Sequence, residues 1–164
     1  MVFTNKNMDI KWQYKAMKYD LSKQFHTYDF NVMKQCFETD QKIRRFFQVY
    51  PSREKYTSFA QNDVLFNIWN WDPTWTVSVK ENGVDLTVKQ HYIEDPLHTI
   101  SYDVPRTYTN GELTSSFKTC KTHHMFSVRA SSATSTLEFT VTDGFGNVHT
   151  ETMTRPKAFN VDMD

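Results

Sequence analysis

The sequence predicts a mainly β protein, an immunoglobulin-like β-sandwich with a short helical insertion near residues 31–50. Apolar and polar residues alternate over many short segments, as they do in strands with one buried face. Turn-forming residues separate these segments roughly every eight to twelve residues, the spacing of sandwich strands. Thirteen Phe, eight Tyr and four Trp add side chains that favour pleated, half-buried surfaces.

Size and charge limit the functional classes. The 164 residues suffice for one domain with its own core, so we expect a single domain over residues 1–164. Lys plus Arg and Asp plus Glu both total 19, which leaves no net field to attract nucleic acid or an anionic membrane. The mean hydropathy of -0.64 fits a soluble chain, and no apolar run approaches the roughly 20 residues that span a bilayer.

Two strands are expected near the N-terminus. Over residues 8–17, Ile10, Trp12 and Tyr14 alternate with polar residues, which predicts that these three side chains form one buried face. Residues 23–30 continue the same alternation and predict a second strand.

The spacing of apolar residues then changes to three and four between Asn31 and Tyr50. This spacing predicts two short helices on one apolar face. Thr39 and Asp40 form a cap between them, and Pro51 ends the second.

The remaining chain is predicted to be β-rich. Residues 63–71 carry apolar side chains at both odd and even positions, which is typical of a central strand buried on both faces. Asp72-Pro73 ends that strand, and Glu81-Asn82-Gly83 is predicted to be a hairpin turn. The further strands are expected over residues 74–80, 84–93, 98–104, 124–130 and 136–143, with a last one after residue 147.

The tetrapeptide Gly146-Asn147-Val148-His149 differs by one residue from the Gly-Asn-His run that binds metal in binuclear phosphoesterases. It lies between two alternating segments, and the glycines beside it suit a tight loop. A binuclear site would also need several further Asp and His ligands converging on two metal ions. A β-hairpin therefore accounts for this stretch without a metal.

Other catalytic patterns are weak. Cys120-x-x-His123 is the best zinc-like fragment, but a structural zinc site needs four ligands and only Cys36 adds a second thiolate. Cys36 lies on the apolar face of an expected helix, where a cysteine usually packs in a core. The sequence leaves open whether Cys36 and Cys120 pair. Glu94-Asp95 before Pro96 is interpreted as a turn rather than as an acid and base pair.

Three long phrases carry a family resemblance. They are "WNWDPTWTVSVKENG", "EDPLHTISYDVPR" and "HMFSVRASSATSTLEFTVTDGFGNVHTETMTRPKAF". The chain closely resembles the C-terminal domain of Bacteroidetes-type calcineurin-like phosphoesterases, over nearly its whole length. The resemblance implies a parent protein with a small β domain, a central domain holding two divalent metal ions, and this module as its noncatalytic C-terminal domain.

The resemblance also implies the partner and the compartment. The partner is the upstream phosphoesterase domain of the same polypeptide, on which this domain packs or whose active-site mouth it shapes. The parent is expected to be secreted or periplasmic. No catalytic residue, metal ligand or cofactor is expected within this chain.

Two sets of aromatic residues are candidates for interaction. Trp69, Trp71 and Trp75 are a candidate docking cluster, although tryptophans on alternating strands also fill sandwich cores. Tyr92, Tyr102 and Tyr108 are candidates for an alternative function, in which the domain binds carbohydrate or cell envelope through exposed aromatic rings. A coplanar, solvent-facing platform would favour sugar binding, and an irregular apolar patch would favour domain docking.

Overall fold

The computed structural model describes residues 2–6, 9–17, 19–110 and 118–161. The strands are β1 (Val2–Lys6), β2 (Asp9–Gln13), β3 (Phe25–Asp29), β4 (Asp63–Ile68), β5 (Thr76–Glu81), β6 (Val84–Asp85), β7 (Lys89–Glu94), β8 (Lys121–Arg129), β9 (Thr136–Thr142) and β10 (Val148–Thr154). The helices are α1 (Phe30–Thr39), α2 (Gln41–Val49), α3 (Pro96–His98), the π-helix η1 (Thr99–Asp103) and α4 (Val104–Asn110).

Two four-stranded antiparallel sheets form the body, which confirms the mainly β prediction. One sheet has the order β10-β9-β5-β6 and the other β3-β4-β8-β7. Apolar side chains from the two sheets meet in a common buried cluster, which includes Phe66 of β4, Phe126 of β8 and Phe139 of β9. The body is therefore consistent with a β-sandwich.

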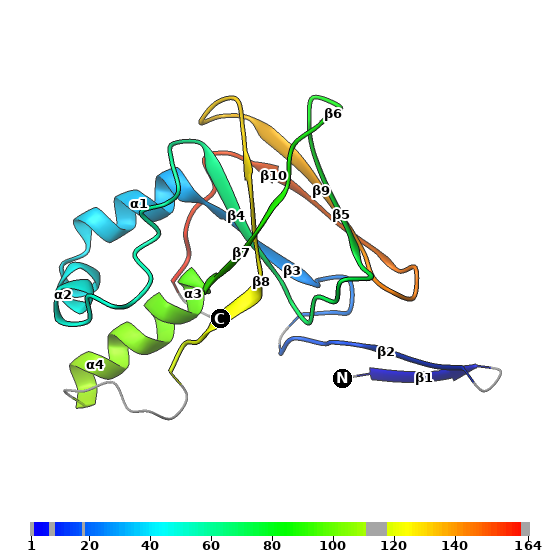
Figure 1. Ribbon diagram of the computed structural model, residues 1–164, viewed down its shortest axis with the longest axis horizontal. Coiled ribbons are helices and arrows are strands. Elements are labelled where there is room, and N and C mark those ends of the chain that lie inside the picture. The colour runs from blue at the N-terminus through cyan, green and yellow to red at the C-terminus, as the bar shows by residue number, and fades with distance from the viewer. Residues whose placement is uncertain (1, 7–8, 18, 111–117, 162–164) are drawn as a thin grey trace.

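The helices form a third layer on the outer face of the β3-β4-β8-β7 sheet (Figure 1). Leu65 of β4 and Met125 of β8 are fully buried there beside Phe30 and Met33 of α1. The predicted helices over residues 31–50 are confirmed. Asp40 accepts hydrogen bonds from the backbone N–H groups of Lys42 and Ile43 and so begins α2.

The prediction of a central strand is confirmed for residues 63–68, which form β4, whereas residues 69–71 leave the strand in a turn. β4 pairs with β3 on one side and with β8 on the other. Val64, Phe66 and Ile68 face the space between the sheets, while Leu65 faces the helices. The apolar residues at both odd and even positions are explained by this burial on two faces.

The prediction of a strand over residues 98–104 is wrong, because this segment forms η1 and the start of α4. Ile100 and Val104 are four residues apart, so their spacing fits a helix as well as a strand, and both are buried against α2. Asp95 and Pro96 contain the deciding signal. The Asp95 carboxylate caps α3 by accepting from the His98 N–H, and proline suits the first turn of a helix.

The expected strand over residues 84–93 is divided in two. β6 pairs with β5 in one sheet, whereas β7 pairs with β8 in the other. The chain therefore crosses from sheet to sheet between them, and the partly buried Leu86 and Val88 pack against the core that joins the sheets.

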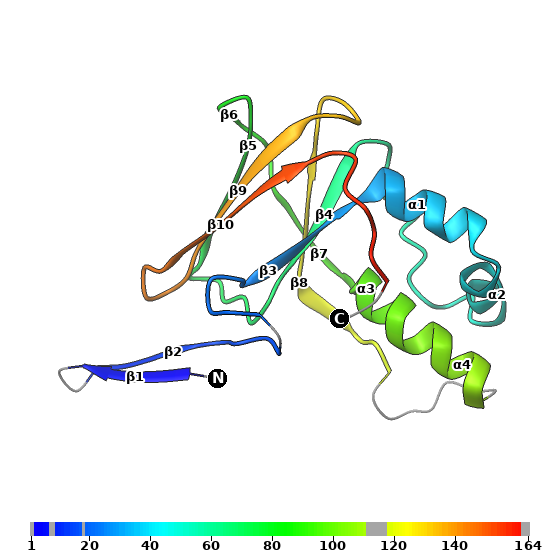
Figure 2. The same ribbon diagram turned by 180° about the vertical axis from the view of Figure 1, so that it is seen from behind.

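The predicted buried face at the N-terminus is also wrong. β1 and β2 pair only with each other among the described strands, and Figures 1 and 2 show the hairpin extending beyond the sandwich. None of the described strands outside the hairpin covers it, and Ile10 remains 66% exposed and Tyr14 40% exposed. Trp12 is partly buried and contacts Phe145 of the β9–β10 loop, with ring centroids 6.0 Å apart.

A buried ion pair joins the end of the chain to the start of α1. Arg155 follows β10 and donates from Nη2 and Nε to the two carboxylate oxygens of Asp29, at 2.9 and 3.1 Å. Both side chains are fully buried. Asp29 also accepts from the N–H of Asn31 as the cap of α1. One carboxylate thus connects β3, the helical layer and the C-terminal segment.

Removing this carboxylate is expected to destabilise the fold strongly. Asp29→Ala leaves the Arg155 guanidinium buried without its counter-charge, so the free energy of unfolding should fall by about 3–5 kcal/mol in urea denaturation. Glu38→Ala is the matched control, since its pair with Lys34 is exposed and 3.8 Å long, and the expected change is below about 0.5 kcal/mol. Equal effects of the two substitutions would contradict this account.

Candidate functional site

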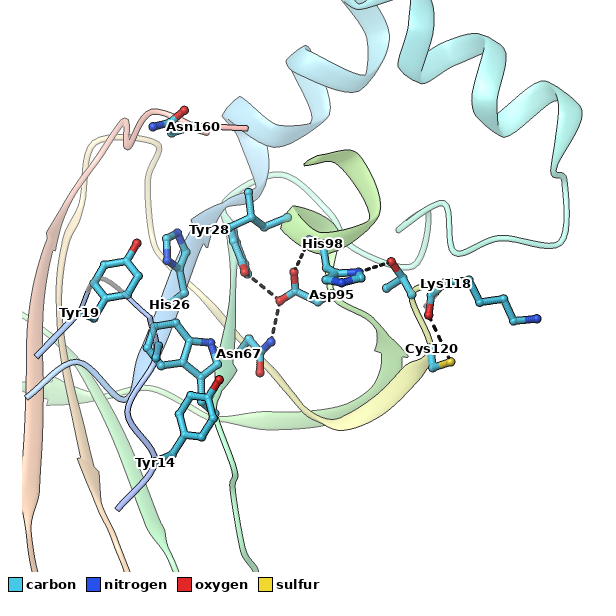
Figure 3. A pocket seen from close by; sticks show the side chains of 14 residues that line it. Tyr14, Tyr19, His26, Tyr28, Asn67, Asp95, His98, Lys118, Cys120 and Asn160 are labelled. Atoms are coloured by element: carbon cyan, nitrogen blue, oxygen red, sulfur yellow. Dashed lines mark hydrogen bonds between the residues drawn. The ribbon is translucent and has the colours of Figure 1, made fainter. Parts of the chain in front are cut away.

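A cavity of about 570 Å³ lies at one end of the β3-β4-β8-β7 sheet. It is bounded by the segment after β2, by β3 and β4, and by the chain around α3 and before β8 (Figure 3). Its volume falls within the range of small-molecule sites in proteins. It combines aromatic and polar side chains, which makes it a candidate site.

Strand register brings the polar floor of this cavity together. His26 of β3 is paired with Asn67 of β4. Tyr28 lies two residues after His26, so these three side chains lie on the same face of the sheet, and Trp69 follows in the turn after β4. All four line the cavity, on the side of the sheet that carries the helices.

Asp95 is the centre of the floor. Its Oδ2 accepts from the Tyr28 hydroxyl at 2.8 Å and from the Asn67 amide at 2.7 Å, and its Oδ1 accepts from the His98 N–H at 2.8 Å. Burial raises the pKa of Tyr28 well above its ordinary value, and the neighbouring Asp95 carboxylate acts in the same direction. The phenol therefore keeps its proton and remains a hydrogen-bond donor.

His26 is a neutral imidazole at physiological pH. Burial lowers its pKa from 6.5 to about 4, and the ammonium groups of Lys157 and Lys23 act in the same direction. Those two ammonium groups both pair with Glu151, at 2.7 and 2.6 Å. A neutral imidazole has one donor and one acceptor nitrogen, so His26 adds uncharged hydrogen-bonding capacity to the cavity.

A buried ionic network lies behind the floor and holds the α3–η1 segment. Arg53 pairs with Asp103 of η1, and its Nε lies 3.0 Å from a Glu94 carboxylate oxygen. Asp103 also accepts from the Thr119 N–H, at 3.2 Å. Thr119 contacts the His98 Nδ1 through its hydroxyl, at 2.5 Å. Helix and loop are therefore fixed to each other at the cavity wall.

The aromatic wall consists of Trp69, Tyr14 and Tyr19. The Trp69 ring lies 6.2 Å from the Tyr14 ring and 5.6 Å from the Tyr19 ring, between centroids. Figure 3 shows Tyr14 and Tyr19 on one side of the cavity, across from Asp95 and His98. Apolar wall and polar floor together suit a ligand that has both an apolar face and polar groups.

The predicted tryptophans are distributed between two places. Trp69 lines the cavity. Trp71 and Trp75 are partly buried against the core between the sheets, and Trp71 contacts Phe126 at 5.3 Å between centroids. Whether any of the three docks on a partner stays a prediction.

The predicted tyrosines lie on different elements. Tyr92 of β7 is 57% exposed and stacks on His123, at 4.4 Å between centroids. Tyr102 of η1 is partly buried and contacts His98 and Arg106. Tyr108 is in α4, but its side chain lies outside the part that the structure describes. Sugar binding by these three rings stays a prediction.

Cys120 and His123, the two residues of the zinc-like fragment, contact different parts of the protein. Cys120 lines the cavity, whereas His123 stacks on Tyr92. Cys36 is half-buried against the cluster between α2 and η1, and both cysteines are free. Among the described residues, no three His, Cys, Asp or Glu side chains are grouped as metal ligands. None of the described helices is long and apolar enough to cross a membrane.

The hairpin reading of Gly146-Asn147-Val148-His149 is confirmed. Gly146 has a positive φ of 82°, and the Asp143 N–H donates to the Asn147 carbonyl across the loop at 3.0 Å. The Asn147 amide also donates to Asp143, at 2.7 Å. Val148 is exposed and His149 is buried in β10. These residues are used to close the turn between β9 and β10.

Sequence reasoning did not identify the floor of the cavity. Asn67 was a possible signal, as a polar residue inside an otherwise apolar strand, and Asp95 before proline was a second one. Neither pattern indicates that β3, β4 and α3 meet at one point. That meeting is produced by the pairing of distant strands.

Comparison with known proteins gives one match. The sequence pattern of the family described as the C terminal of calcineurin-like phosphoesterase matches residues 1–149. No curated protein and no solved structure shows a match to the chain.

The pKa of His26 gives a pH dependence that experiment can check. Between pH 6.5 and 4 the unfolded chain binds the His26 proton and the folded chain does not, so the free energy of unfolding falls as pH falls through this window. His26→Gln should reduce the loss of stability between pH 7 and pH 4.5, measured by urea denaturation at both values. His123→Gln, at an exposed histidine outside the cavity, should leave that loss unchanged. A His26→Gln variant with the unaltered loss would contradict the assignment.

Proposed function

The chain belongs to the family of C-terminal domains of calcineurin-like phosphoesterases, and on that basis we propose that it is a noncatalytic accessory domain. In this proposal it packs on an upstream phosphoesterase domain of the same polypeptide and shapes access to that domain's active site. The two divalent metal ions and the catalytic residues belong to the upstream domain. The parent is predicted to be secreted or periplasmic.

The β1–β2 hairpin and the segment after it are the observation that carries the packing proposal. Nine large apolar side chains are exposed within the described part of the chain, and four of them lie between residues 10 and 19. They include Ile10 at 66% and Met17 at 87% exposure. Apolar side chains gathered on one projecting segment favour a protein contact.

The proposal assigns metal binding and hydrolysis to the upstream domain. Hydrolysis by two metal ions needs a set of converging ligands that holds both ions and activates water. The described residues contain no group of three candidate ligands. The carboxylate at the centre of the cavity, Asp95, is engaged by three donors from the protein itself.

The docking proposal predicts protection of the hairpin segment in the parent protein. Amide hydrogen exchange over residues 10–17 should be slower in the parent polypeptide than in the 164-residue chain, because the upstream domain covers these residues. Ile10→Asp combined with Met17→Asp should restore fast exchange, since two charges cannot be buried at an apolar contact. Equal exchange in parent and chain would contradict docking at this segment.

A matched control separates docking from a general effect of surface charge. Val84→Asp changes a side chain of nearly equal exposure, 67%, in β6 of the sandwich. It should leave the exchange of residues 10–17 in the parent unchanged. The same variants also report on access, because loss of docking should change the parent's turnover of phosphate esters whereas Val84→Asp should not.

The noncatalytic assignment predicts no phosphatase activity in this chain. The purified chain should release no phosphate from p-nitrophenyl phosphate with Mn²⁺, Zn²⁺ or Mg²⁺ added, while the parent polypeptide should do so under the same conditions. Metal-dependent turnover by the chain, abolished by a chelator, would overturn the assignment.

A further inference from the structure

The β1–β2 hairpin has an open backbone edge. β1 pairs with β2 over five consecutive residue pairs, from Val2 with Gln13 to Lys6 with Asp9. In an antiparallel pair only every second residue of a strand bonds to its neighbour, so the alternate N–H and C=O groups of β1 point away from β2. Neither strand pairs with any other described strand. The outer edge of β1 therefore presents backbone donors and acceptors to which no described strand is paired.

The sandwich is on the wrong side of the hairpin to supply a strand to β1. Figures 1 and 2 both show β2 between β1 and the body of the domain, so the outer edge of β1 faces away from that body. The other described strands pair among themselves in the two four-stranded sheets. A strand that pairs with the outer edge of β1 must therefore come from another part of the polypeptide or from another molecule.

The edge of β1 lacks the features that usually block the edge of a sheet. Those features include proline, bulges and charged side chains. The β1 sequence, Val-Phe-Thr-Asn-Lys, contains no proline and a single charged residue, and its register with β2 has no bulge. Valine, phenylalanine and threonine favour strands. Because a two-stranded hairpin is at best marginally stable in water, a third strand would stabilise this one.

The segment after β2 is fixed to the sandwich, so the hairpin projects in a defined direction. The buried Gln24 donates from Nε2 to the backbone carbonyls of Tyr14 and Leu21, at 2.7 and 2.9 Å. The Gln24 carbonyl accepts from the Trp69 N–H, at 2.9 Å. Trp12 of β2 contacts the β9–β10 loop. An edge that is held in place before binding lowers the ordering cost of adding a strand.

The exposed apolar side chains and the family match indicate which partner supplies the strand. Ile10 and Met17, at 66% and 87% exposure, lie on the hairpin and the segment after it, next to the open edge in the chain. The family is that of C-terminal domains, so the neighbour of this domain is the upstream part of the polypeptide. A tethered partner can act at an effective concentration on the order of 1 mM, which favours it over a second copy of the chain.

We infer that an edge strand of the upstream phosphoesterase domain pairs with the outer edge of β1, so that one β-sheet continues across the two domains. Backbone hydrogen bonds form this contact, as in other cases of strand addition to an open edge. Apolar side chains such as Ile10 pack beside it. The inference rests on the proposed accessory function and adds the chemistry of the partner surface, which is an unpaired strand edge.

Hydrogen exchange resolved to single amides tests the inference in the parent polypeptide and in the 164-residue chain. Alternate amides of β1 should exchange fast in the chain, because they point to solvent. The same amides should exchange about tenfold more slowly, or slower still, in the parent, since each gains a hydrogen bond. Fast exchange of these amides in the parent would overturn the inference.

The same measurement distinguishes strand addition from the docking proposal. Protection of residues 10–17 in the parent without protection of the alternate β1 amides would overturn strand addition and leave side-chain docking in place. Loss of both kinds of protection would overturn both. Protection of the alternate amides in the 164-residue chain that rises with its concentration would assign the edge to a second copy, and would also overturn the inference.

Paired substitutions separate backbone pairing from side-chain contact. Neighbouring residues in a strand direct their N–H groups to opposite edges, so the N–H of either Phe3 or Thr4 points outward. Phe3→Pro and Thr4→Pro are both made, and the outward position is the one at which the β2 amides of the chain stay protected, because proline is tolerated where an edge N–H faces solvent. In the parent, that proline should abolish the added protection of the other outward amides.

Valine at the same position is the matched control. Phe3→Val or Thr4→Val keeps the backbone N–H and the preference for a strand, so the added protection should remain in the parent. An equal loss of protection with valine and with proline would indicate a side-chain contact and overturn the inference. Where both prolines disrupt the hairpin itself, the exchange comparison of the unaltered proteins decides.

Discussion

The burial of β4 on both faces is the constraint on which the other layers depend. Val64, Phe66 and Ile68 need the second sheet to cover them, and Leu65 needs the helices. A strand with apolar residues at both odd and even positions cannot lie at the surface without large apolar exposure. The second sheet therefore covers one face of β4, and the helical layer covers the other. β4 also contains Asn67 near its end, so the same strand contributes to the floor of the cavity.

Asp95 connects the fold to the cavity. As the cap of α3 it fixes where the chain leaves β7 and begins the second helical segment. As an acceptor for Tyr28 and Asn67 it ties that segment to β3 and β4. Three donors fix the Asp95 carboxylate in the floor of the cavity. The floor is therefore held together by hydrogen bonds within the protein. The ionic network of Arg53, Asp103 and Glu94 fixes the neighbouring backbone in the same way.

The chain belongs to the family of C-terminal phosphoesterase domains. Its apolar side chains are distributed differently in the body of the domain and in the N-terminal hairpin segment. The body of the domain buries its apolar side chains between layers, whereas the hairpin segment keeps Ile10 and Met17 exposed. In the proposed accessory role the domain needs stability of its own and a separate contact surface for its neighbour, and different parts of this chain would meet the two requirements. The cavity beside Trp69 is a third part, and it combines aromatic rings with the polar groups of Asp95 and Asn67.

The sequence by itself determined the strands whose side chains alternate, the two helices begun at Asp29 and Asp40, and the β9–β10 hairpin, because these depend on local period, capping and turn chemistry. It also determined the family. The tertiary structure decided the rest. Ile100 and Val104 fit two periods; Asp95 and Pro96 mark a helix start, and packing against α2 buries the helical face that follows. The N-terminal alternation produced a strand, but whether a sheet covers Ile10 depends on the arrangement of the domain. The cavity depends on the register of β3 with β4 and on the approach of Asp95, which join residues far apart in the chain and leave no signal in any single segment.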